Sequence, residues 1–268
     1  MHKFVLVFLF LAIVPAVCAQ QATQQATQQA IDYSQYDRLT RTYINAEGRV
    51  NYVGLKRELA ALKTFTDQLS TVSPDSHPQL FKDEKDKLRY FATAYNAWVL
   101  YIVTSNYPKK DTLWGLVFFK DQQIKLGGQM STLETLEHKI LRPRFNDPRI
   151  HFYINCAAKD CPPLPQGAIA LGQTDAALEK AARRFINNTK YVNYDAARKR
   201  LEISPIFKWF KEDFSGYLKT QRGIASPHIA QFLLLFMNDG ATKTALAGVP
   251  VNELSVSYKS YDKSLNEQ

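Results

Sequence analysis

The sequence predicts an α+β fold in a single domain, with a buried central helix packed on a small mixed or antiparallel sheet. Three patterns predict it: a long apolar helix over 83–106, alternating residues over 149–155 and two strand-like runs within 191–203. Of the 268 residues, 46% are apolar and 22% are charged, which is typical of a globular chain. This composition excludes a collagen, a coiled coil and a wholly disordered protein.

The first segment has the three parts of a signal peptide. Lys3 precedes an apolar run from Phe4 to Val14, and small residues follow up to Ala19. We therefore expect residues 1–19 to be cleaved and the protein to be secreted or periplasmic. A lipoprotein that begins at Cys18 fits less well, because neighbours such as Pro15 disturb the lipidation pattern. The apolar run is too short for a membrane anchor, so we expect no transmembrane span after cleavage.

Residues 20–30 repeat Gln, Ala and Thr without a large apolar side chain, which predicts a disordered spacer. Since no later linker interrupts the chain, we expect one globular domain over 31–268. The formal net charge is +9, and removal of Lys3 with the signal peptide lowers it by one. Such a charge is compatible with an anionic surface as partner. We expect no nucleic-acid partner, because the chain is exported and lacks a basic aromatic module.

The central helix is expected to end before Pro108. Its middle, 90–103, is apolar on nearly every face, which is typical of a helix buried in a core. Asn96 stands at its centre, and its amide can make up to four hydrogen bonds. Two roles are open for it: a structural bond to the backbone of an adjacent loop, or membership of a functional site.

Several elements follow this helix. The pattern over 112–126, broken at Gly127-Gly128, predicts a strand and a turn. Ser131 and Glu134 have the spacing of a capping box, which predicts a helix that runs through Leu141 and ends before Pro143. The later patterns predict a helix over 176–187, a hairpin within 191–203 and a helix around 231–238.

Two of these elements carry polar side chains in apolar surroundings. On the helix predicted to run through Leu141, Glu137 falls inside the apolar stripe and His138 lies to its side. The carboxylate of Glu137 therefore needs a partner. The alternation over 149–155 predicts a β-strand with apolar residues on one face and His151, Tyr153 and Asn155 on the other. This polar row either faces solvent or lines a cleft.

Two cysteines, Cys156 and Cys161, follow directly. In an oxidising compartment a pair this close suits a local disulfide, although two free thiols or two metal ligands are also compatible with the spacing. A zinc set of both cysteines with His138 and His151 has acceptable ligand types, but the spacing fits no common zinc motif. We therefore expect no cofactor, with zinc as the competing expectation.

Motifs in order along the mature chain carry a resemblance to a known family. They are Ala94-Tyr95-Asn96-Ala97, Asn106-Tyr107-Pro108, Glu137-His138, Ile140-Leu141-Arg142, Asp147 to Phe152, Asn155-Cys156, Cys161 to Leu164, Ser204 to Phe210, Glu212-Asp213-Phe214 and Tyr261 to Asn266. Together they resemble the domain of unknown function 547 family, whose activity is not established. The resemblance implies a characteristic set of Asn96, Glu137, His138, His151, Asn155, Cys156 and Cys161. The family often has glycine where this chain has Ala157 and tryptophan where it has Lys263.

Two classes of function remain, and whether the protein is an enzyme stays open. The first is a hydrolase or transferase of the cysteine-hydrolase type, papain-like or transglutaminase-like by analogy. Its candidate catalytic residues are His151, Glu137, His138, Asn96, Cys156 and Cys161. In a second version the cysteines are bonded to each other, and the histidines and Glu137 act as acid and base. The other class is an envelope protein that binds a small molecule or an envelope component without transforming it, with a structural Cys156–Cys161 disulfide.

Overall fold

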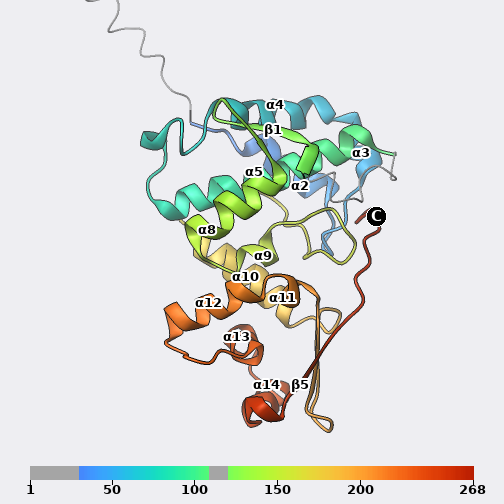
Figure 1. Cartoon of the computed structure of the whole chain (residues 1–268). Helices are drawn as coiled ribbons and strands as arrows, with labels where there is room; N and C mark the ends of the chain where they lie inside the picture. The colour runs from blue at the N-terminus through green and yellow to red at the C-terminus, as the bar shows by residue number, and fades with distance from the viewer. Residues whose placement is uncertain (1–29, 109–119) are drawn as a thin grey trace, which may run out of the picture. The chain divides into compact units, whose positions relative to one another are not determined.

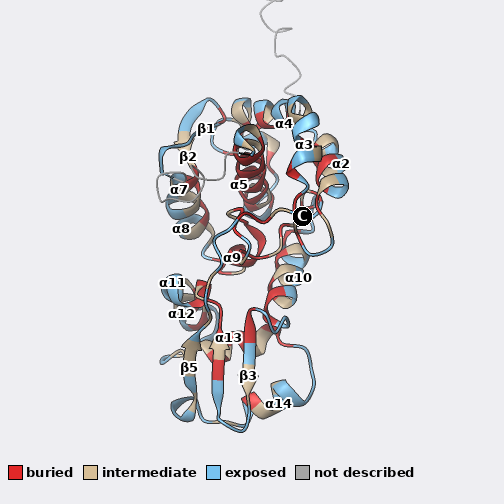
Figure 2. Cartoon of the chain, turned by 90° about the vertical axis from the view of Figure 1, so that its right-hand side faces the viewer, coloured by how far each residue is buried: buried red, intermediate tan, exposed pale blue. Residues whose placement is uncertain are grey.

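A buried helix, α5 (Glu84–Asn106), lies at the centre of the computed structural model, which describes residues 30–108 and 120–268 (Figure 1). Asp83 caps this helix by accepting a hydrogen bond from the amide of Asp86. Every residue from Tyr90 to Leu100 is buried, as Figure 2 shows in red. The apolar pattern on all faces therefore predicted this helix and its burial correctly.

Helices and one hairpin share the core of α5. The helices are α2 (Ser34–Tyr43), α3 (Tyr52–Arg57), α4 (Leu59–Thr71) and the short η1 (Pro78–Leu80), and the hairpin pairs β1 (Gln123–Leu126) with β2 (Gln129–Thr132) in antiparallel register. The central helix packs mainly on α4 and less extensively on α3, on residues 136–141 and on residues 174–186, and the hairpin packs on α4. Ile124 and Leu126 of β1 belong to the same hydrophobic core as α5. The predicted turn at Gly127-Gly128 joins the two strands.

The helical segment after the hairpin begins and ends later than expected. It consists of α7 (Leu133–Thr135), the π-helical turn η2 (Leu136–Leu141) and α8 (Arg142–Phe145). Thr132, not Ser131, is the cap: its hydroxyl accepts the amide of Thr135, while Ser131 pairs within the hairpin. Pro143 does not stop the segment, because it stands in the first turn of α8, where a missing N–H costs no hydrogen bond.

The β-strand predicted over 149–155 is wrong: this segment contains the short helix α9 (Ile150–Tyr153). The carboxylate of Asp147 accepts the amide of Arg149, and the amide of His151 donates to the carbonyl of Pro148, so a tight turn leads into the helix. All residues of α9 are buried. The alternation of polar and apolar residues therefore did not separate a core face from a solvent face.

The second half of the chain builds a separate hydrophobic cluster. Its elements are α10 (Thr174–Ile186), β3 (Val192–Asp195), β4 (Arg200–Ile203), α11 (Ile206–Trp209), α12 (Lys211–Arg222), α13 (Ile229–Phe236), α14 (Ala241–Ala247), η3 (Val251–Glu253) and β5 (Ser255–Tyr258). β4 lies between antiparallel β3 and parallel β5, which gives the predicted hairpin and a mixed sheet. Phe152 of α9 belongs to this second cluster, whereas Ile150 belongs to the first. The fold is α+β, as predicted, and α9 contributes to both cores.

The C-terminal segment crosses back to the first core. The amide of Val50 donates to the carbonyl of Asn266, and Tyr52 donates its hydroxyl to the Asn266 side chain at 2.6 Å. The Asn266 amide in turn donates to the side chain of Asn155 at 3.2 Å. Gly48, nearby, has φ +78°, and a Cβ there would lie 2.5 Å from the backbone nitrogen of Leu164. The C-terminal segment and the cysteine loop are thus packed together.

Some predictions lie outside the described residues. They are the signal peptide, all of the spacer except Ala30, and the part of the predicted strand over 112–119. Within 30–108 and 120–268, no helix is long and apolar enough to cross a bilayer.

Candidate functional site

A cavity of about 450 Å³ lies where the two cores meet the cysteine loop and the C-terminal segment. Its walls are formed by Tyr95, Lys120, Glu134, Glu137, His138, His151, Ile154, Cys156, Ala158, Cys161, Pro162, Ile206, Trp209, Phe210, Tyr261 and Lys263. Five of the six candidate catalytic residues are among them, and only Asn96 is not. An acid, two imidazoles and both cysteines therefore lie in the wall of one cavity, whereas the amide of Asn96 lies outside it.

His151 is held in the wall by a carboxylate and an aromatic ring. Its Nε2 lies 2.7 Å from Oδ2 of Asp213 on α12, and the ring of Phe210 stacks on it at 3.8 Å. An ionised Asp213 can only accept, so Nε2 of His151 carries a proton and donates it to this contact. No hydrogen bond to Nδ1 is found within the described part of the chain. The ring thus has one nitrogen oriented by Asp213 and one without a hydrogen bond among the described residues.

Asp213 is kept ionised by a second partner. Arg142 donates to both carboxylate oxygens, with Nε at 2.7 Å and Nη2 at 2.9 Å. Burial alone would raise the pKa of Asp213, but the hydrogen bonds from His151 and Arg142 outweigh it and hold that pKa well below its usual value. Arg142 also donates through Nη1 to Nδ1 of His138 at 2.7 Å. His138 is exposed.

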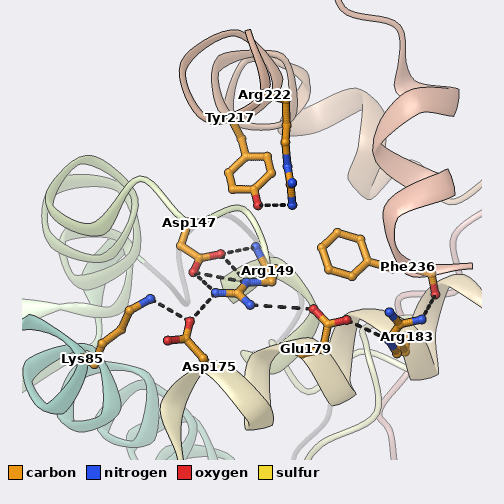
Figure 3. Close-up of polar contacts among 9 residues, drawn as sticks. All are labelled: Lys85, Asp147, Arg149, Asp175, Glu179, Arg183, Tyr217, Arg222 and Phe236. Atoms are coloured by element: carbon orange, nitrogen blue, oxygen red, sulfur yellow. Dashed lines mark hydrogen bonds and ion pairs between the residues drawn. The ribbon is translucent and has the colours of Figure 1, made fainter. Parts of the chain in front are cut away.

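Arg149, at the start of α9, fixes the helix that carries His151 (Figure 3). Its guanidinium contacts Asp147 at 2.7 Å, Asp175 of α10 at 2.7 Å and Glu179 of α10 at 3.8 Å. Burial alone would lower the pKa of Arg149. The hydrogen bonds and charges of Asp147 and Asp175 outweigh burial and hold that pKa above its usual value. A permanently charged Arg149 therefore ties α9 to α10 and limits the movement of His151.

Glu137 has the partner that its position in an apolar stripe requires. Tyr95 of α5 donates its hydroxyl to Oε2 of Glu137 at 3.0 Å. Burial raises the pKa of Tyr95 well above its usual value, and the negative charge and hydrogen bond of Glu137 raise it further. Tyr95 is therefore a neutral donor, and Glu137 is held against the cavity wall.

Cys156 and Cys161 are joined by a disulfide, so of the three states compatible with their spacing the bonded one is present. The hydroxyl of Tyr261 donates to Sγ of Cys161 at 3.1 Å. In this form neither cysteine can be a thiolate nucleophile or a metal ligand. Over 30–108 and 120–268, no group of three or more His, Cys, Asp or Glu side chains is arranged to hold a metal ion.

Asn96 has a structural position. Its Oδ1 accepts the amide of Asn155 at 2.9 Å, and its Nδ2 donates to the carbonyl of Tyr153 at 3.1 Å. Asn155 accepts the amide of Ala157 and donates to the carbonyl of Pro162, so it organises the cysteine loop. Ala157 has φ +62°, a region that favours glycine, which gives a physical reason for the family's frequent glycine at this position.

The mouth of the cavity contains an exposed aromatic residue and two lysines. Trp209 is 52% exposed and meets the ring of Tyr261 edge-on at 4.8 Å. Lys120 pairs with Glu134 at 3.5 Å, and Lys263 is exposed. Trp209 and Tyr261 come from the second half of the chain, which therefore supplies this side of the cavity.

Several wall and support residues were not among the predicted site residues. Asp213, Arg142, Tyr95, Phe210 and Tyr261 all stand within the motifs that carry the family resemblance. The only sequence signal for Asp213 was this presence in a motif, since 62 residues separate it from His151.

The fold and cavity define an α+β protein with a carboxylate-oriented histidine in a partly aromatic pocket. The family described as "Protein of unknown function, DUF547" matches residues 78–186. This match confirms the family that the motifs indicate: residues 78–186 belong to DUF547. The matched segment contains Glu137, His151 and both cysteines, whereas Asp213 and Tyr261 lie beyond it. No curated protein and no solved structure matches the chain, so the analogy with papain and transglutaminase stays a prediction.

Proposed function

We propose that the protein is an exported hydrolase or transferase in which His151, oriented by Asp213, is the general base. The observation that carries this proposal is the 2.7 Å contact between Nε2 of His151 and Asp213 in a cavity wall. A carboxylate at one imidazole nitrogen fixes the tautomer and stabilises the imidazolium that forms when the other nitrogen takes a proton. Nδ1 of His151 is the nitrogen left for that proton.

The bonded cysteines favour the acid and base version of the enzyme. Nδ1 of His151 takes a proton from water, or from an acceptor hydroxyl, while its oxygen attacks the electrophilic centre of the substrate. The bond to the leaving group breaks, and His151 returns the proton to that group. His138 and Glu137 line the same cavity and are the remaining candidates for proton transfer.

A cysteine-hydrolase version of the same site requires reduction of the disulfide. Cys156 would then be the nucleophile, because it is the more exposed of the two cysteines in the wall. The test is simple: iodoacetamide labelling of natively purified protein must detect a free thiol. Complete absence of labelling would exclude this version and leave the acid and base version in place.

The second candidate function is capture of a ligand without chemistry. The observation that favours it is the disulfide, which removes the thiolate nucleophile from a cavity with largely aromatic and aliphatic walls. The two functions differ in one measurable respect. An enzyme consumes its ligand, whereas a binding protein releases it unchanged.

The experiment incubates the purified protein with the small-molecule fraction of a cell-envelope extract and follows compounds by mass spectrometry. We expect at least one compound to be consumed, and His151→Gln to slow this by about 100-fold or more. His77→Gln is the matched control, because His77 does not line the cavity. Equal consumption by His151→Gln would refute the assignment of the base. Retention of a compound without consumption would support the binding protein instead.

A further inference from the structure

The charged side chains in and behind the cavity wall do not all have an ion-pair partner. Glu134 pairs with Lys120, and Asp213, behind the wall, pairs with Arg142. Glu137 differs, because its hydrogen bond comes from the neutral hydroxyl of Tyr95. Within the described part of the chain, no lysine, arginine or histidine lies within ion-pair distance of Glu137. Glu137 acts on Arg142 electrostatically, but without a close contact. The cavity therefore contains a carboxylate that has no ion-pair partner among the described residues.

The surroundings of Glu137 are partly apolar. Glu137 stands on the π-helical turn η2 and is half-buried. Its charge acts on two phenols: after burial, it is among the causes that raise the pKa of Tyr95 and of Tyr261. A carboxylate beside aromatic rings attracts a positive charge that enters the cavity. A cationic group of a ligand would supply that charge.

The aromatic walls suit the same kind of group. The negative face of an aromatic ring attracts an organic cation. Phe210 is already covered by His151 at 3.8 Å and by the guanidinium of Arg142 at 5.0 Å. Tyr261 and Trp209 also line the cavity and meet each other edge-on. Among the exposed large apolar residues of the described chain, only Trp209 lines this cavity.

We propose that the cavity binds a ligand with an organic ammonium group, whose charge pairs with Glu137 and whose hydrocarbon part contacts Tyr261 and Trp209. The inference rests on the proposed use of this cavity as the ligand site and adds the chemical class of the ligand. A volume of about 450 Å³ is enough for a moderately sized organic molecule. Lys263 at the mouth offers the opposite charge, so an anionic ligand is the competing outcome.

Three probes of the same shape and different charge separate these outcomes. They are choline, its neutral carbon analogue 3,3-dimethylbutan-1-ol and the anion 3,3-dimethylbutanoate. Their affinities for the full oxidised protein are measured by ligand-observed NMR titration. We expect choline to bind about tenfold more tightly than the neutral analogue, as is typical of a charge-assisted contact. The anion is expected to bind most weakly.

Two variants assign this preference to one carboxylate. Glu137→Gln keeps the shape of the side chain and should remove the tenfold preference for choline. Glu134→Gln is the matched control, because Glu134 lines the same cavity but already has Lys120 as its partner. It should retain the preference, and circular dichroism checks that both variants are folded.

The inference is overturned by equal binding of choline and its neutral analogue, by tighter binding of the anion, or by the absence of saturable choline binding. A preference for choline that survives Glu137→Gln also overturns it. If Glu137→Gln does not fold, Glu137→Asp takes its place. A preference for choline weaker than that of Glu134→Gln then supports the inference, and an equal preference contradicts it. These probes do not react, so the outcome is independent of the consumption measured with His151→Gln. Failure of one proposal is therefore distinguishable from failure of the other.

Discussion

Replacement of Asn96 by alanine tests the structural basis of the cavity. Asn96 is fully buried, with an exposed fraction of 0%. Its side chain is bonded to the amide of Asn155 at 2.9 Å and to the carbonyl of Tyr153 at 3.1 Å. Asn96→Ala removes both bonds at once and leaves two backbone groups without these partners in the protein interior. It does not remove any residue of the cavity wall.

The size of the effect follows from these two groups. A buried donor or acceptor left unpaired costs about 1–3 kcal/mol. The two groups together predict a loss of about 2–6 kcal/mol in the free energy of unfolding. A typical domain has about 5–15 kcal/mol in total, so the variant is expected to be folded but clearly weakened.

Urea unfolding followed by circular dichroism measures this loss in the oxidised protein. Asn106→Ala is the matched control on the same helix, because Asn106 is exposed and its side chain donates to the carbonyl of Ile102 one turn earlier. Its expected effect is about 0.5 kcal/mol or less. If Asn96→Ala costs less than about 1 kcal/mol, the two buried bonds do not hold the 153–155 segment in place.

Two further predictions concern charge and backbone. The pKa of Asp213 is lowered in the folded state, so Asp213 stabilises the protein above the pKa of the unfolded chain, and this stabilisation is lost as the pH falls toward the folded pKa. The stability advantage of the wild type over Asp213→Asn should therefore shrink as the pH falls below about 4 in urea unfolding; an advantage that does not change between about pH 5 and about pH 3 would contradict this. Gly48→Ala should cost at least about 2 kcal/mol, because its positive φ is combined with a backbone clash. Gly172→Ala, with φ +75° but no atom within 4 Å of the added Cβ, should cost only about 1 kcal/mol, and equal losses by thermal unfolding would refute the role of the clash.

The parts of the fold that could be predicted are those where local pattern and burial agree. The middle of helix α5 is apolar on nearly every side and buried, and the β3–β4 hairpin forms within 191–203 as expected. The segment of α9 shows the opposite case. Its residues are buried by two different cores, so alternating residue types had no relation to a sheet face. The turn formed by Asp147 and Pro148 decided its conformation instead.

The candidate site shows the same limit. Glu137 could be selected because a carboxylate in an apolar stripe violates the local pattern. Asp213 could not, because it stands in the first turn of an amphipathic helix, where acidic residues are common. Its role depends on tertiary packing that brings α12 against α9. Asn96 was open between two roles, and the hydrogen bonds to 153–155 favour the structural one.

The C-terminal crossing has a consequence for synthesis. Residues 261–268 supply Tyr261 to the cavity and bond to Val50 and Tyr52, which leave the ribosome some two hundred residues earlier. A nascent chain that has folded its first core still lacks one wall of the pocket until translation is nearly finished. Assembly of the site is thus a late event, and intermediates that precede it would expose the cysteine loop to oxidation before its final neighbours are in place.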